Sequence, residues 1–431
     1  MQFLSFLDMQ NSKICIVGLG YVGLPLACLC AKKAFTTFGY DINNKVIEEL
    51  KKGETIINEQ SLKEKLALVK DKITFSSSPQ IIKEADVVVV CVPTPINEQY
   101  RPNLEPLISS IKTVKQYIKP GALIILESTI FPGTSEEVVL PLLKPLLLGT
   151  DFYLAHCPER IDPGNKTWNI SNIPRVVGGI TEECSKKATE LYKLILDADV
   201  LQLNSIKAAE ATKIMENSFR DVNIAFMNEM AKSFQSLGID ISEVIKAAST
   251  KPFAFMPHYP GCGVGGHCIP VDPYYLIEKA KQSGFDHKFL ALARDINNSM
   301  PLYTVNLIVD GLNKAGKAVN GSKILILGLA YKPNVNDMRE SPSFEIIKQL
   351  KKKGANLIIF DPHVLEKSDV VSLDEVKECD CVVLVTSHHD FKKITPDVLM
   401  QKQVRVVVDG RNFFDKQSIV SKEIIYKGIG R

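Results

Sequence analysis

One of the ten cysteines stands in a sequence context that could support nucleophilic chemistry. Cys268 lies in the run PGCGVGGHCIPVDP, next to His267 and four residues before Asp272. A thiolate can add to an aldehyde, and the resulting thiohemiacetal can lose a hydride to become a thioester. Asp272 could orient a water molecule or balance charge in such a site. Two other interpretations stay open: Cys268 could be a buried structural cysteine in a turn, and His267 could be a packing residue that points away.

The cysteine loop is also rich in glycine, with Gly261, Gly263, Gly265 and Gly266 ahead of the thiol. Glycine backbone allows a ligand to approach closely. We therefore expect the loop to present the thiol where a substrate can reach it, and Gly265 is a candidate substrate contact.

A second motif predicts a dinucleotide site. The β-rich run Lys13–Val17 is followed by GLGYVG and then by a helical stretch. In this pattern the first glycine allows a tight turn, the second lets the backbone approach a pyrophosphate, and the third permits close packing of helix on strand. The helix N-terminus offers N–H groups and partial positive charge to the phosphates. The candidate cofactor contacts in this run are Gly18, Gly20, Tyr21, Val22 and Gly23.

An acidic residue completes the dinucleotide pattern. A second β-rich run, Thr37–Tyr40, ends at Asp41, eighteen residues beyond Gly23. A carboxylate there can accept hydrogen bonds from both ribose hydroxyls and would repel a 2′-phosphate, so NAD is favoured over NADP. Lys45 could lie near the adenosine ribose, although a solvated helix lysine fits equally well.

Strands and helices alternate through the first part of the chain, which predicts a doubly wound parallel sheet. We expect strands at Lys13–Val17, Thr37–Tyr40, Asp86–Val92 and Ala122–Glu127, with helices at Leu24–Lys33 and Lys45–Lys52.

The middle of the chain has a helical period instead. Apolar residues recur at helical spacing from Ser205 to Leu237, and a helix of about 30 residues would run ~45 Å. We expect this helix to link two domains and to support a subunit interface. Helical segments continue to about Asn313, interrupted by a loop at Pro257–Pro273.

A second α/β unit follows, in which GLAYKP keeps Gly328 but has Ala330 in place of the second glycine. This argues against a second cofactor, so this lobe is expected to bind the other substrate. Its expected strands are Lys323–Leu327, Asn356–Phe360, Cys381–Thr386 and Val404–Asp409, with a helix at Ser343–Lys352. The predicted fold is two Rossmann-like α/β domains joined by a central helical domain. The predicted divisions are an extension at 1–11, an NAD-binding domain at 12–204, the helical domain at 205–315 and a C-terminal domain at 316–431.

Composition narrows the classes of function. The 431 residues are 45% hydrophobic and 23% charged with a net charge of +3, so a nucleic-acid-binding footprint is absent. No apolar stretch approaches the ~20 residues that span a bilayer. The start MQFLSFLDMQ lacks a basic flank and a cleavage site, so we expect a reduced, cytoplasmic protein. The cysteines show no CxxC spacing and do not cluster with histidine, so no metal site is expected.

Taken in order, the motifs resemble those of the UDP-glucose/UDP-N-acetylhexosamine 6-dehydrogenase family, over nearly the whole chain from about Ser12. Beside GLGYVG and the cysteine loop, the matching stretches are DVVVVCVPTP, ESTIFPGT, HCPERIDPG, EATKIMENSFRDVNIAFMNE, LGLAYKPNVNDMRESP and VVDGRN. Within that family the cysteine loop looks most like the branch acting on UDP-N-acetylglucosamine.

The resemblance implies two successive oxidations, of an alcohol to an aldehyde and of the aldehyde to an acid, with two NAD and one water consumed. Cys268 would hold the second-stage substrate as a thiohemiacetal and then a thioester. Lys213 and Asn217 match a polar pair that addresses one oxyanion, and their i, i+4 spacing puts both on one helical face. Asp272 and Thr129 match residues that hold a water, and Glu159 matches the general base of thioester hydrolysis.

The resemblance also implies the binding contacts. Lys332 and Arg411 would face the UDP-sugar, whereas Arg339, Thr94 and Thr129 would contact the cofactor. Some relatives carry an arginine before the cysteine loop that reaches a neighbouring subunit's substrate. Here that stretch reads KPFAFMPH, so His258 or an aromatic residue could replace it. A homodimer or higher homo-oligomer is expected, and the product would feed surface-polysaccharide or glycan synthesis.

Several alternatives stay open from the sequence. The sugar is first UDP-N-acetylglucosamine, then UDP-N-acetylmannosamine, then UDP-glucose, because loop contacts worth only a few kcal/mol separate them. A two-electron hydroxyacid dehydrogenase of the 6-phosphogluconate type would share the Rossmann–helical arrangement but would use lysine and no cysteine. A non-catalytic nucleotide sensor would bind NAD without turnover.

Overall fold

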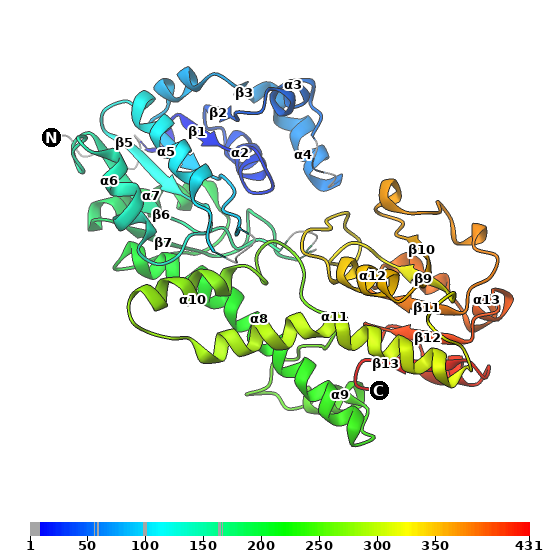
Figure 1. The fold of residues 1–431 in the computed structure, drawn as a ribbon. Coiled ribbons are helices and arrows are strands. Elements are labelled where there is room, and N and C mark those ends of the chain that lie inside the picture. Colours follow the sequence, from blue (N-terminus) through cyan, green and yellow to red (C-terminus); the bar gives the residue numbers. More distant parts are fainter. Residues whose placement is uncertain (1–8, 56, 58–59, 98–100, 163–164, 166) are drawn as a thin grey trace. The chain divides into compact units, whose positions relative to one another are not determined.

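The computed structural model describes residues 9–55, 57, 60–97, 101–162, 165 and 167–431 (Figure 1). The chain forms two compact units. The first comprises Met1–Glu216 with Tyr274–Phe285, and the second comprises Asn217–Pro273 with Asp286–Arg431. The four-part division expected from the sequence stays a prediction.

The first unit is built on an eight-stranded sheet with the order β3-β2-β1-β4-β5-β6-β7-β8. Neighbouring strands run parallel except β6 and β7, which are antiparallel. The strands are β1 Ile14–Val17, β2 Thr37–Tyr40, β3 Ile73–Ser76, β4 Val87–Val90, β5 Ala122–Leu126, β6 Phe152–His156, β7 Arg175–Gly179 and β8 Val200–Gln202.

Helices cover both faces of this sheet, as the continuous apolar strands require. Alternate residues of one strand enter opposite cores: Ile14 and Ile16 of β1 pack with α2, α4 and α7, whereas Cys15 and Val17 pack with α5 and α6. The helices are α2 Gly23–Lys32, α3 Asn44–Lys52, α4 Gln60–Val69, α5 Glu105–Tyr117, α6 Leu140–Leu143 and α7 Glu182–Ile195. The prediction of a doubly wound sheet is confirmed.

The second unit contains a five-stranded parallel sheet with the order β10-β9-β11-β12-β13. Its strands are β9 Lys323–Leu327, β10 Asn356–Phe360, β11 Cys381–Leu384, β12 Val406–Asp409 and β13 Ile425–Gly428. Helices α11 and α12 pack on one face and α13 and α14 on the other. These helices are α11 Lys288–Lys314, α12 Pro342–Lys352, α13 Pro396–Gln401 and α14 Lys416–Val420.

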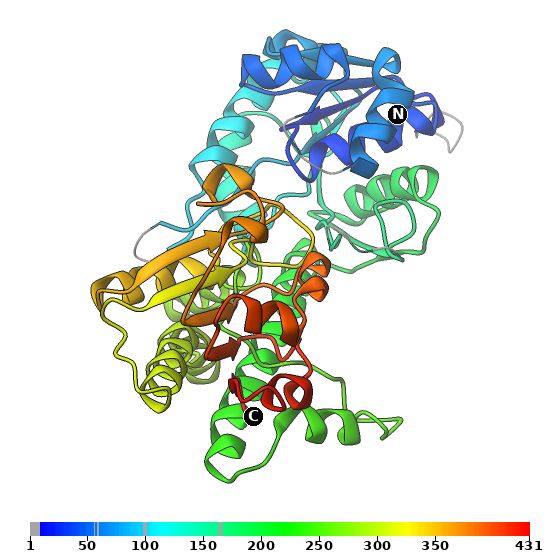
Figure 2. The ribbon, with the colours of Figure 1, turned by 90° about the vertical axis from the view of Figure 1, so that its right-hand side faces the viewer.

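The long helix expected over 205–237 is α8, Ile206–Ser236, which is followed by α9, Ile241–Ala248. Within the second unit, α8 contributes Met227 and Ala231 to the core beneath α11. The end of the chain lies against α8 and α9, as Figure 2 shows, because the Ile241 N–H donates to the Gly430 carbonyl at 2.9 Å.

Three strands are at least two residues shorter than predicted, since Asp86–Val92 is Val87–Val90, Cys381–Thr386 is Cys381–Leu384 and Val404–Asp409 is Val406–Asp409. Two of the predicted boundaries have a clear physical reason for the difference. The strand expected at Asp86–Val92 begins at Val87 and ends at Val90. It does not include Asp86, because the Asp86 carboxylate accepts the Lys13 N–H at 2.8 Å and pairs with Lys119 at 2.6 Å. The loop expected to reach Pro273 ends earlier, since Asp272 begins α10, Asp272–Gln282. The Asp272 N–H donates to the Cys268 carbonyl at 2.8 Å and closes that helical turn.

No helix in the described part of the chain has both the length and the apolarity to cross a membrane. The structure describes all ten cysteines, and none of them forms a disulfide bond; Cys268 alone among them is exposed.

A buried polar network joins α8, α11 and the cysteine loop in the second unit. Arg294 donates to the Asp221 carboxylate at 2.6 Å, and Asn297 donates to the same carboxylate at 2.8 Å. Asn228 donates to the Asn297 side chain and accepts the Gly261 N–H at 2.9 Å. Asp221 and Arg294 are 0% and 3% exposed, so each charge depends on its partner for compensation.

We therefore expect Asp221→Ala to lower the stability of the protein by about 3–5 kcal/mol, because it leaves the Arg294 guanidinium buried without its counter-charge. The measurement is the midpoint of urea unfolding. The matched control is the double variant Asp221→Leu with Arg294→Met, which removes both charges and should recover most of the loss. A single variant that unfolds at the wild-type urea midpoint would show that the Asp221–Arg294 ion pair does not stabilise the fold.

Candidate active site

The three glycines of GLGYVG occupy different environments that match their predicted roles. Gly18 has φ +90°, and a Cβ on it would lie 2.9 Å from the Cys91 carbonyl oxygen. A Cβ on Gly23 would lie 1.9 Å from the Gly18 oxygen, so this glycine is needed for helix α2 to pack on β1. A Cβ on Gly20 would meet nothing within 4 Å. The open side of the turn is therefore where a pyrophosphate can approach the backbone.

The groups around this turn fit NAD. Val22 caps α2 without a side-chain hydrogen bond, and Tyr21 beside it is exposed, so the helix N-terminus can serve phosphate oxygens. The Asp41 carboxylate accepts the Leu19 N–H at 2.9 Å and is thereby held at the turn. Each of its oxygens has a further lone pair for a ribose hydroxyl. Lys45 is exposed in the first turn of α3, and no contact decides between its two interpretations.

Thr94 and Thr129, both in the first unit, are brought together. The Thr94 hydroxyl donates to the Thr129 carbonyl at 2.6 Å, and Tyr275 donates to the Thr94 carbonyl. The loop after Thr129 is tied to α8, because the buried Glu210 accepts the N–H groups of Gly133 at 2.5 Å and Ser135 at 2.8 Å. The two segments that carry these threonines are thus fixed before any ligand binds.

Glu159 follows β6 in the first unit and is 7% exposed. Its carboxylate is paired with the fully buried Arg175 and accepts the Ile161 N–H at 2.6 Å. Arg160 instead forms an ion pair with Glu216 at 2.5 Å. Lys213, one turn earlier on α8, is 8% exposed, which is unusual for a solvated lysine and fits a functional one.

Cys268 is exposed, whereas Cys262 in the same loop is 0% exposed. The possibility that Cys268 is a buried structural cysteine is therefore excluded. Its carbonyl accepts the N–H groups of Val271 and Asp272, which fixes the backbone of the thiol-bearing turn.

Asn217 and Asp272 are in direct contact within the second unit. The Asn217 amide donates to the Asp272 carboxylate at 2.5 Å. Because Asp272 is 3% exposed and sits in the first turn of α10, its charge is also favoured by the helix N-terminus. The resemblance gave these two residues separate roles, and the hydrogen bond makes them one unit beside the cysteine turn.

Three glycines of the cysteine loop lie where a side chain would clash with other residues of the second unit. A Cβ on Gly265 would lie 2.7 Å from Tyr331 Cβ, and one on Gly266 would lie 2.8 Å from the Tyr331 ring. A Cβ on Gly261 would lie 2.3 Å from the Arg411 guanidinium. The close approach of a ligand expected at these glycines stays a prediction, and the structure shows a packing role for them. They let the loop pack against the GLAYKP turn and Arg411 of the same unit, so the contact expected between Gly265 and substrate stays a prediction.

His267 and Arg339 lie on the same side of the loop. Arg339 grips Asp337 through its guanidinium at 2.6 Å, and its carbonyl accepts the Gly266 N–H at 2.9 Å. Burial, with the Arg339 charge, lowers the pKa of His267. The imidazole is therefore favoured in its neutral form. The assignment of Arg339 to the cofactor stays a prediction.

The residues expected at the nucleotide end surround the GLAYKP turn. Lys332 is half-buried in that turn, and Arg411 donates to the Val385 carbonyl at 2.8 Å. His258 is held by the Met256 carbonyl at 3.0 Å and packs edge-on to Phe219. The role expected for His258, as a replacement for the arginine that reaches a neighbouring subunit's substrate in some relatives, stays a prediction.

The second glycine turn differs from the first at its acidic residue. Asp361 accepts the N–H groups of Leu329 at 2.6 Å and Ala330 at 2.9 Å, and it also pairs with His388 at 3.0 Å. Asp361 and His388 are both fully buried, and His388 in turn accepts the Asn334 N–H at 2.9 Å. This carboxylate is saturated by the protein itself, which supports the prediction that the turn does not bind a second dinucleotide.

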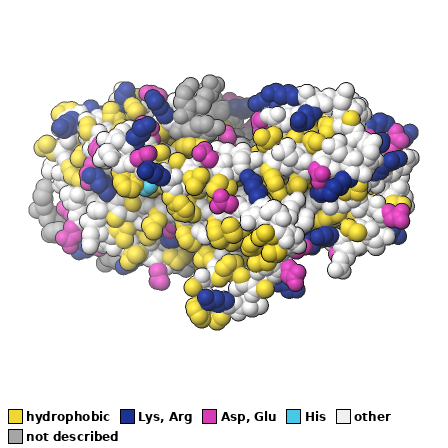
Figure 3. Space-filling view, turned by 60° about the horizontal axis from the view of Figure 1, so that its bottom comes forward, with side chains coloured by type: hydrophobic (Ala, Val, Ile, Leu, Met, Phe, Trp, Pro, Cys, Tyr) yellow, Lys and Arg dark blue, Asp and Glu magenta, His cyan; other side chains and the backbone are white. Residues whose placement is uncertain are grey.

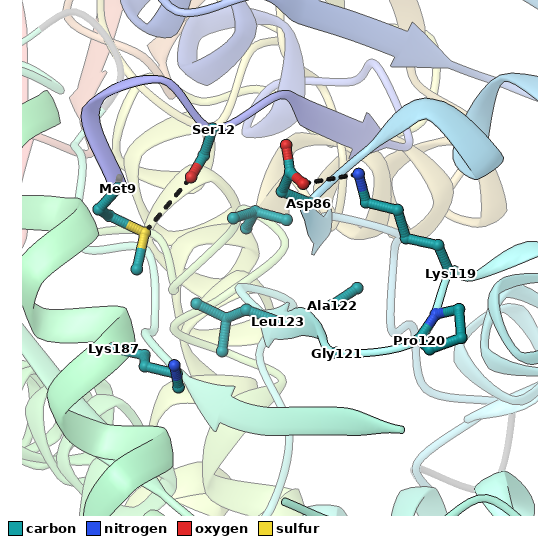
Figure 4. A pocket seen from close by; sticks show the side chains of 10 residues that line it. Met9, Ser12, Asp86, Lys119, Pro120, Gly121, Ala122, Leu123 and Lys187 are labelled. Carbon is teal, nitrogen blue, oxygen red and sulfur yellow. Dashed lines mark hydrogen bonds and ion pairs between the residues drawn. The ribbon is translucent and has the colours of Figure 1, made fainter. Parts of the chain in front are cut away.

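A cavity of about 200 Å³ lies elsewhere in the first unit (Figure 4). Ser12, Asp86 and Gly121 line it at the amino ends of β1, β4 and β5. Ligands of doubly wound sheets bind at the carboxyl ends of the strands. The polar groups of the cavity are also paired with one another, since Asp86 meets Lys119 and Ser12 meets Met9, so it is a packing defect rather than the cofactor site.

The geometry of both units can now be compared with known proteins. Residues 12–196, 207–299 and 325–416 match, in that order, the NAD binding, central and UDP binding domains of the UDP-glucose/GDP-mannose dehydrogenase family. The chain belongs to this family. The dehydrogenase is thus an NAD-dependent oxidoreductase of UDP-sugars, and the prediction of that activity and of NAD as cofactor is confirmed.

Its relatives differ in the sugar that their names give. Protein CapL of Staphylococcus aureus is 37% identical over 424 residues, covering 96% of this chain and 97% of that protein. The UDP-N-acetyl-D-glucosamine 6-dehydrogenase of Pseudomonas aeruginosa is 37% identical, covering 90% and 93%. The solved structure of a UDP-D-ManNAc dehydrogenase from Pyrococcus horikoshii superposes with a TM-score of 0.91 at 35% identity, covering 97% and 99%.

Among the described residues of the dehydrogenase, no group of three or more His, Cys, Asp or Glu side chains could hold a metal. Some residues that shape the site were not predicted, namely Glu127, Arg175, Glu210, Tyr275 and the Asp361–His388 pair. For Glu127 and Arg175 a signal existed, because a charge at the end of an apolar strand is costly and calls for a partner.

Gly20 and Gly23 make a matched pair for testing the cofactor site of the dehydrogenase. We expect Gly20→Ala to fold normally but to bind NADH at least ten-fold more weakly, because its methyl group occupies the open side of the turn. Gly23→Ala should instead lower thermal stability, since its Cβ meets backbone at 1.9 Å. Fluorescence titration with NADH and thermal unfolding measure the two effects. Wild-type NADH affinity in Gly20→Ala would contradict the assignment.

Proposed function

We propose that this dehydrogenase oxidises the C6 primary alcohol of a UDP-N-acetylhexosamine, first of all UDP-N-acetylglucosamine, to the uronic acid. The exposed Cys268 thiol carries the proposal, since the other nine cysteines are buried and the Cys268 carbonyl accepts the N–H of Asp272, the partner of Asn217. A hydroxyacid dehydrogenase that works through lysine would not need such a thiol.

The first oxidation removes a hydride from C6 and a proton from its hydroxyl. NAD, when bound, supplies the hydride acceptor for this step and for the second oxidation. Lys213 and Asn217 lie on one face of α8, where both can donate to the C6 oxygen as negative charge develops. We assign the water that takes up the hydroxyl proton to Thr129 and Asp272.

The second oxidation passes through the cysteine. The Cys268 sulfur adds to the aldehyde carbon, forming an S–C bond and a thiohemiacetal whose oxygen is protonated. Loss of a second hydride from that carbon and of the hydroxyl proton gives a thioester. Water, deprotonated by Glu159, then attacks the thioester, the S–C bond breaks, and the carboxylate and the thiol are released.

The UDP end is assigned to the second unit. Lys332 belongs to the GLAYKP turn, against which the cysteine loop packs, and the Arg411 guanidinium lies against Gly261 of that loop. Basic side chains such as these suit a diphosphate. Relatives named for N-acetylglucosamine and N-acetylmannosamine are about equally similar, at 37% and 36% identity. The order of preference therefore rests on the cysteine loop: UDP-N-acetylglucosamine, then UDP-N-acetylmannosamine, then UDP-glucose. We also propose that the uronic acid serves polysaccharide synthesis. We place the enzyme in the cytoplasm, where ten cysteines outside disulfide bonds would stay reduced.

Stoichiometry tests this proposal. Purified protein with each of the three UDP-sugars should release two NADH per sugar and give the highest kcat/KM with UDP-N-acetylglucosamine. Cys268→Ser should form no uronic acid, because the oxygen ester that a serine would form does not replace the thioester. Its NADH yield should fall well below two per sugar.

Cys262→Ser, in the same loop but away from solvent, is the matched control and should keep the yield of two. One NADH per sugar in the wild type would indicate a two-electron enzyme. NADH binding without any turnover would indicate a sensor, and turnover of UDP-glucose alone would reject the sugar assignment while leaving the chemistry.

We further propose that the enzyme is a homodimer that pairs through the surface of helices α8 and α11 in the second unit. Figure 3 shows hydrophobic side chains gathered on the face that these helices present. Phe219 and Phe226 are each 51% exposed and lie seven residues apart on α8, hence on one helical side. Other exposed apolar side chains of this region are Leu237, Phe253, Met256, Tyr259, Phe289, Leu292 and Leu302. An apolar surface of this kind normally marks an interface.

Sedimentation tests the dimer. The wild type should sediment at twice the chain mass of 47.8 kDa, and Phe226→Asp should shift it to one chain by burying a charge in the interface. Phe344→Asp is the control, because Phe344 is 45% exposed on α12 of the C-terminal sheet. A wild type that sediments as a monomer, or a Phe226→Asp variant that stays dimeric, would reject this interface.

A further inference from the structure

The carboxylate assigned as general base belongs to a buried group of three charges. Glu127 directly follows β5 and is 1% exposed, Arg175 begins β7 and is 0% exposed, and Glu159 follows β6. Because β7 runs antiparallel to β6, its first residue lies at the carboxyl ends of β5 and β6. The group therefore stands at the edge of the sheet where doubly wound folds bind their ligands.

One guanidinium serves both carboxylates. Arg175 donates from Nη2 to Glu159 and from Nη1 to the Pro158 carbonyl at 3.1 Å, and Nη1 lies 3.7 Å from Glu127 Oε2. Tyr192 donates its hydroxyl to the other oxygen of Glu127. Glu127 Oε2 and Arg175 Nε make no hydrogen bond within the described structure. The two acids thus compete for one positive charge, and Glu127 is the less well compensated.

Within the described part of the chain, the titratable groups that interact with Glu127 add no positive charge beside Arg175. The nearest titratable groups are Cys30, Cys91, Cys157 and Tyr192, and burial raises the pKa of each, so all four stay neutral. Burial also raises the pKa of Glu127 to about 7, with Glu159 adding to the effect and Arg175 and Tyr192 opposing it. The charge of this group therefore changes near neutral pH.

We propose that Glu127 is a positioning residue that, through Arg175, sets the basicity of Glu159 during hydrolysis of the thioester. This inference rests on the proposed function of Glu159. When Glu127 holds a proton, Arg175 neutralises Glu159 alone, and the carboxylate is a weak base. When Glu127 loses that proton to solvent, the guanidinium is shared by two negative charges, and Glu159 accepts a proton from water more readily. No atom of Glu127 needs to touch the substrate.

A purely structural ion pair predicts something different. In that case Glu127 would affect only the stability of the core, and the rate of hydrolysis would not follow its ionisation. The pH profile of the hydrolysis step separates the two possibilities, because a structural role does not move it.

The experiment follows acid release from the thioester by rapid quench between pH 5.5 and 9 after the second NADH has formed. In the wild type the rate should rise about three- to ten-fold through pH 7, as expected for a general base strengthened by a nearby charge. Glu127→Gln should lack this rise and keep the low-pH rate throughout. The matched control Glu84→Gln, at an exposed acid of the same unit, should keep the wild-type profile.

Tyr192→Phe gives a second, independent variant. It removes the hydrogen bond that opposes the raised pKa of Glu127, so the rise should move to higher pH without disappearing. A wild-type profile that is flat across pH 7, or a Glu127→Gln variant that keeps its rise, would overturn the inference. Both outcomes differ from failure of the proposed function, in which the wild type would release a single NADH or form no acid at all.

Stability provides a readout that needs no substrate. A carboxyl group with a raised pKa in the folded protein stabilises it at low pH and loses that contribution as pH rises through about 7. The urea midpoint of the wild type should therefore fall between pH 5 and 8 relative to that of Glu127→Gln. Parallel midpoints across this range would show that Glu127 does not titrate there and would overturn the inference.

Discussion

The contact on which the candidate site depends is the glycine packing of the cysteine loop against the GLAYKP turn. Gly265 packs against Tyr331 and Pro342, Gly266 packs against Tyr331, and the Gly266 N–H is bonded to the Arg339 carbonyl. The backbone that presents the thiol is therefore packed directly against the turn that carries Lys332. Because packed interiors tolerate little added volume, a side chain at either glycine would displace the turns of Cys268 and Lys332 together.

The two Rossmann-like turns show how similar backbones acquire different functions. In each, a carboxylate at the end of the second strand accepts an N–H from the glycine turn. Asp41 accepts one N–H of its turn, from Leu19, and the Asn43 N–H, and it keeps acceptor capacity on each oxygen. Asp361 accepts two N–H groups of its turn, the His363 N–H and the His388 imidazole, and it is fully buried. The first turn can thus receive a ribose. In the second turn, the carboxylate at the same position stabilises the turn that carries Lys332.

The sequence predicts most of this fold because its signals are local. Strands such as VVVV and KILIL, the glycine turns and the periodicity of α8 all appear in short windows, and their bounds agree with the structure to within a few residues. The site is harder. Cys268 and the glycines can be identified by motif, but their packing depends on contacts between distant segments, so the motif did not show that Gly265 lies against Tyr331. Likewise Asn217 and Asp272, 55 residues apart, gave no sign of sharing a hydrogen bond.

Buried charge explains what the motifs could not show. An isolated charge in a protein core is costly, so Glu127 and Arg175 at strand ends require partners, yet the sequence does not say which. The antiparallel direction of β7 decides the partners. Because β7 begins where β5 and β6 end, its first residue, Arg175, lies beside Glu127 and Glu159. An apolar residue in place of Glu127 would fill that position at lower cost in free energy. That a carboxylate stands there, only partly compensated by an arginine it shares with Glu159, is what the electrostatics of a tuned base would require and what stability alone would not.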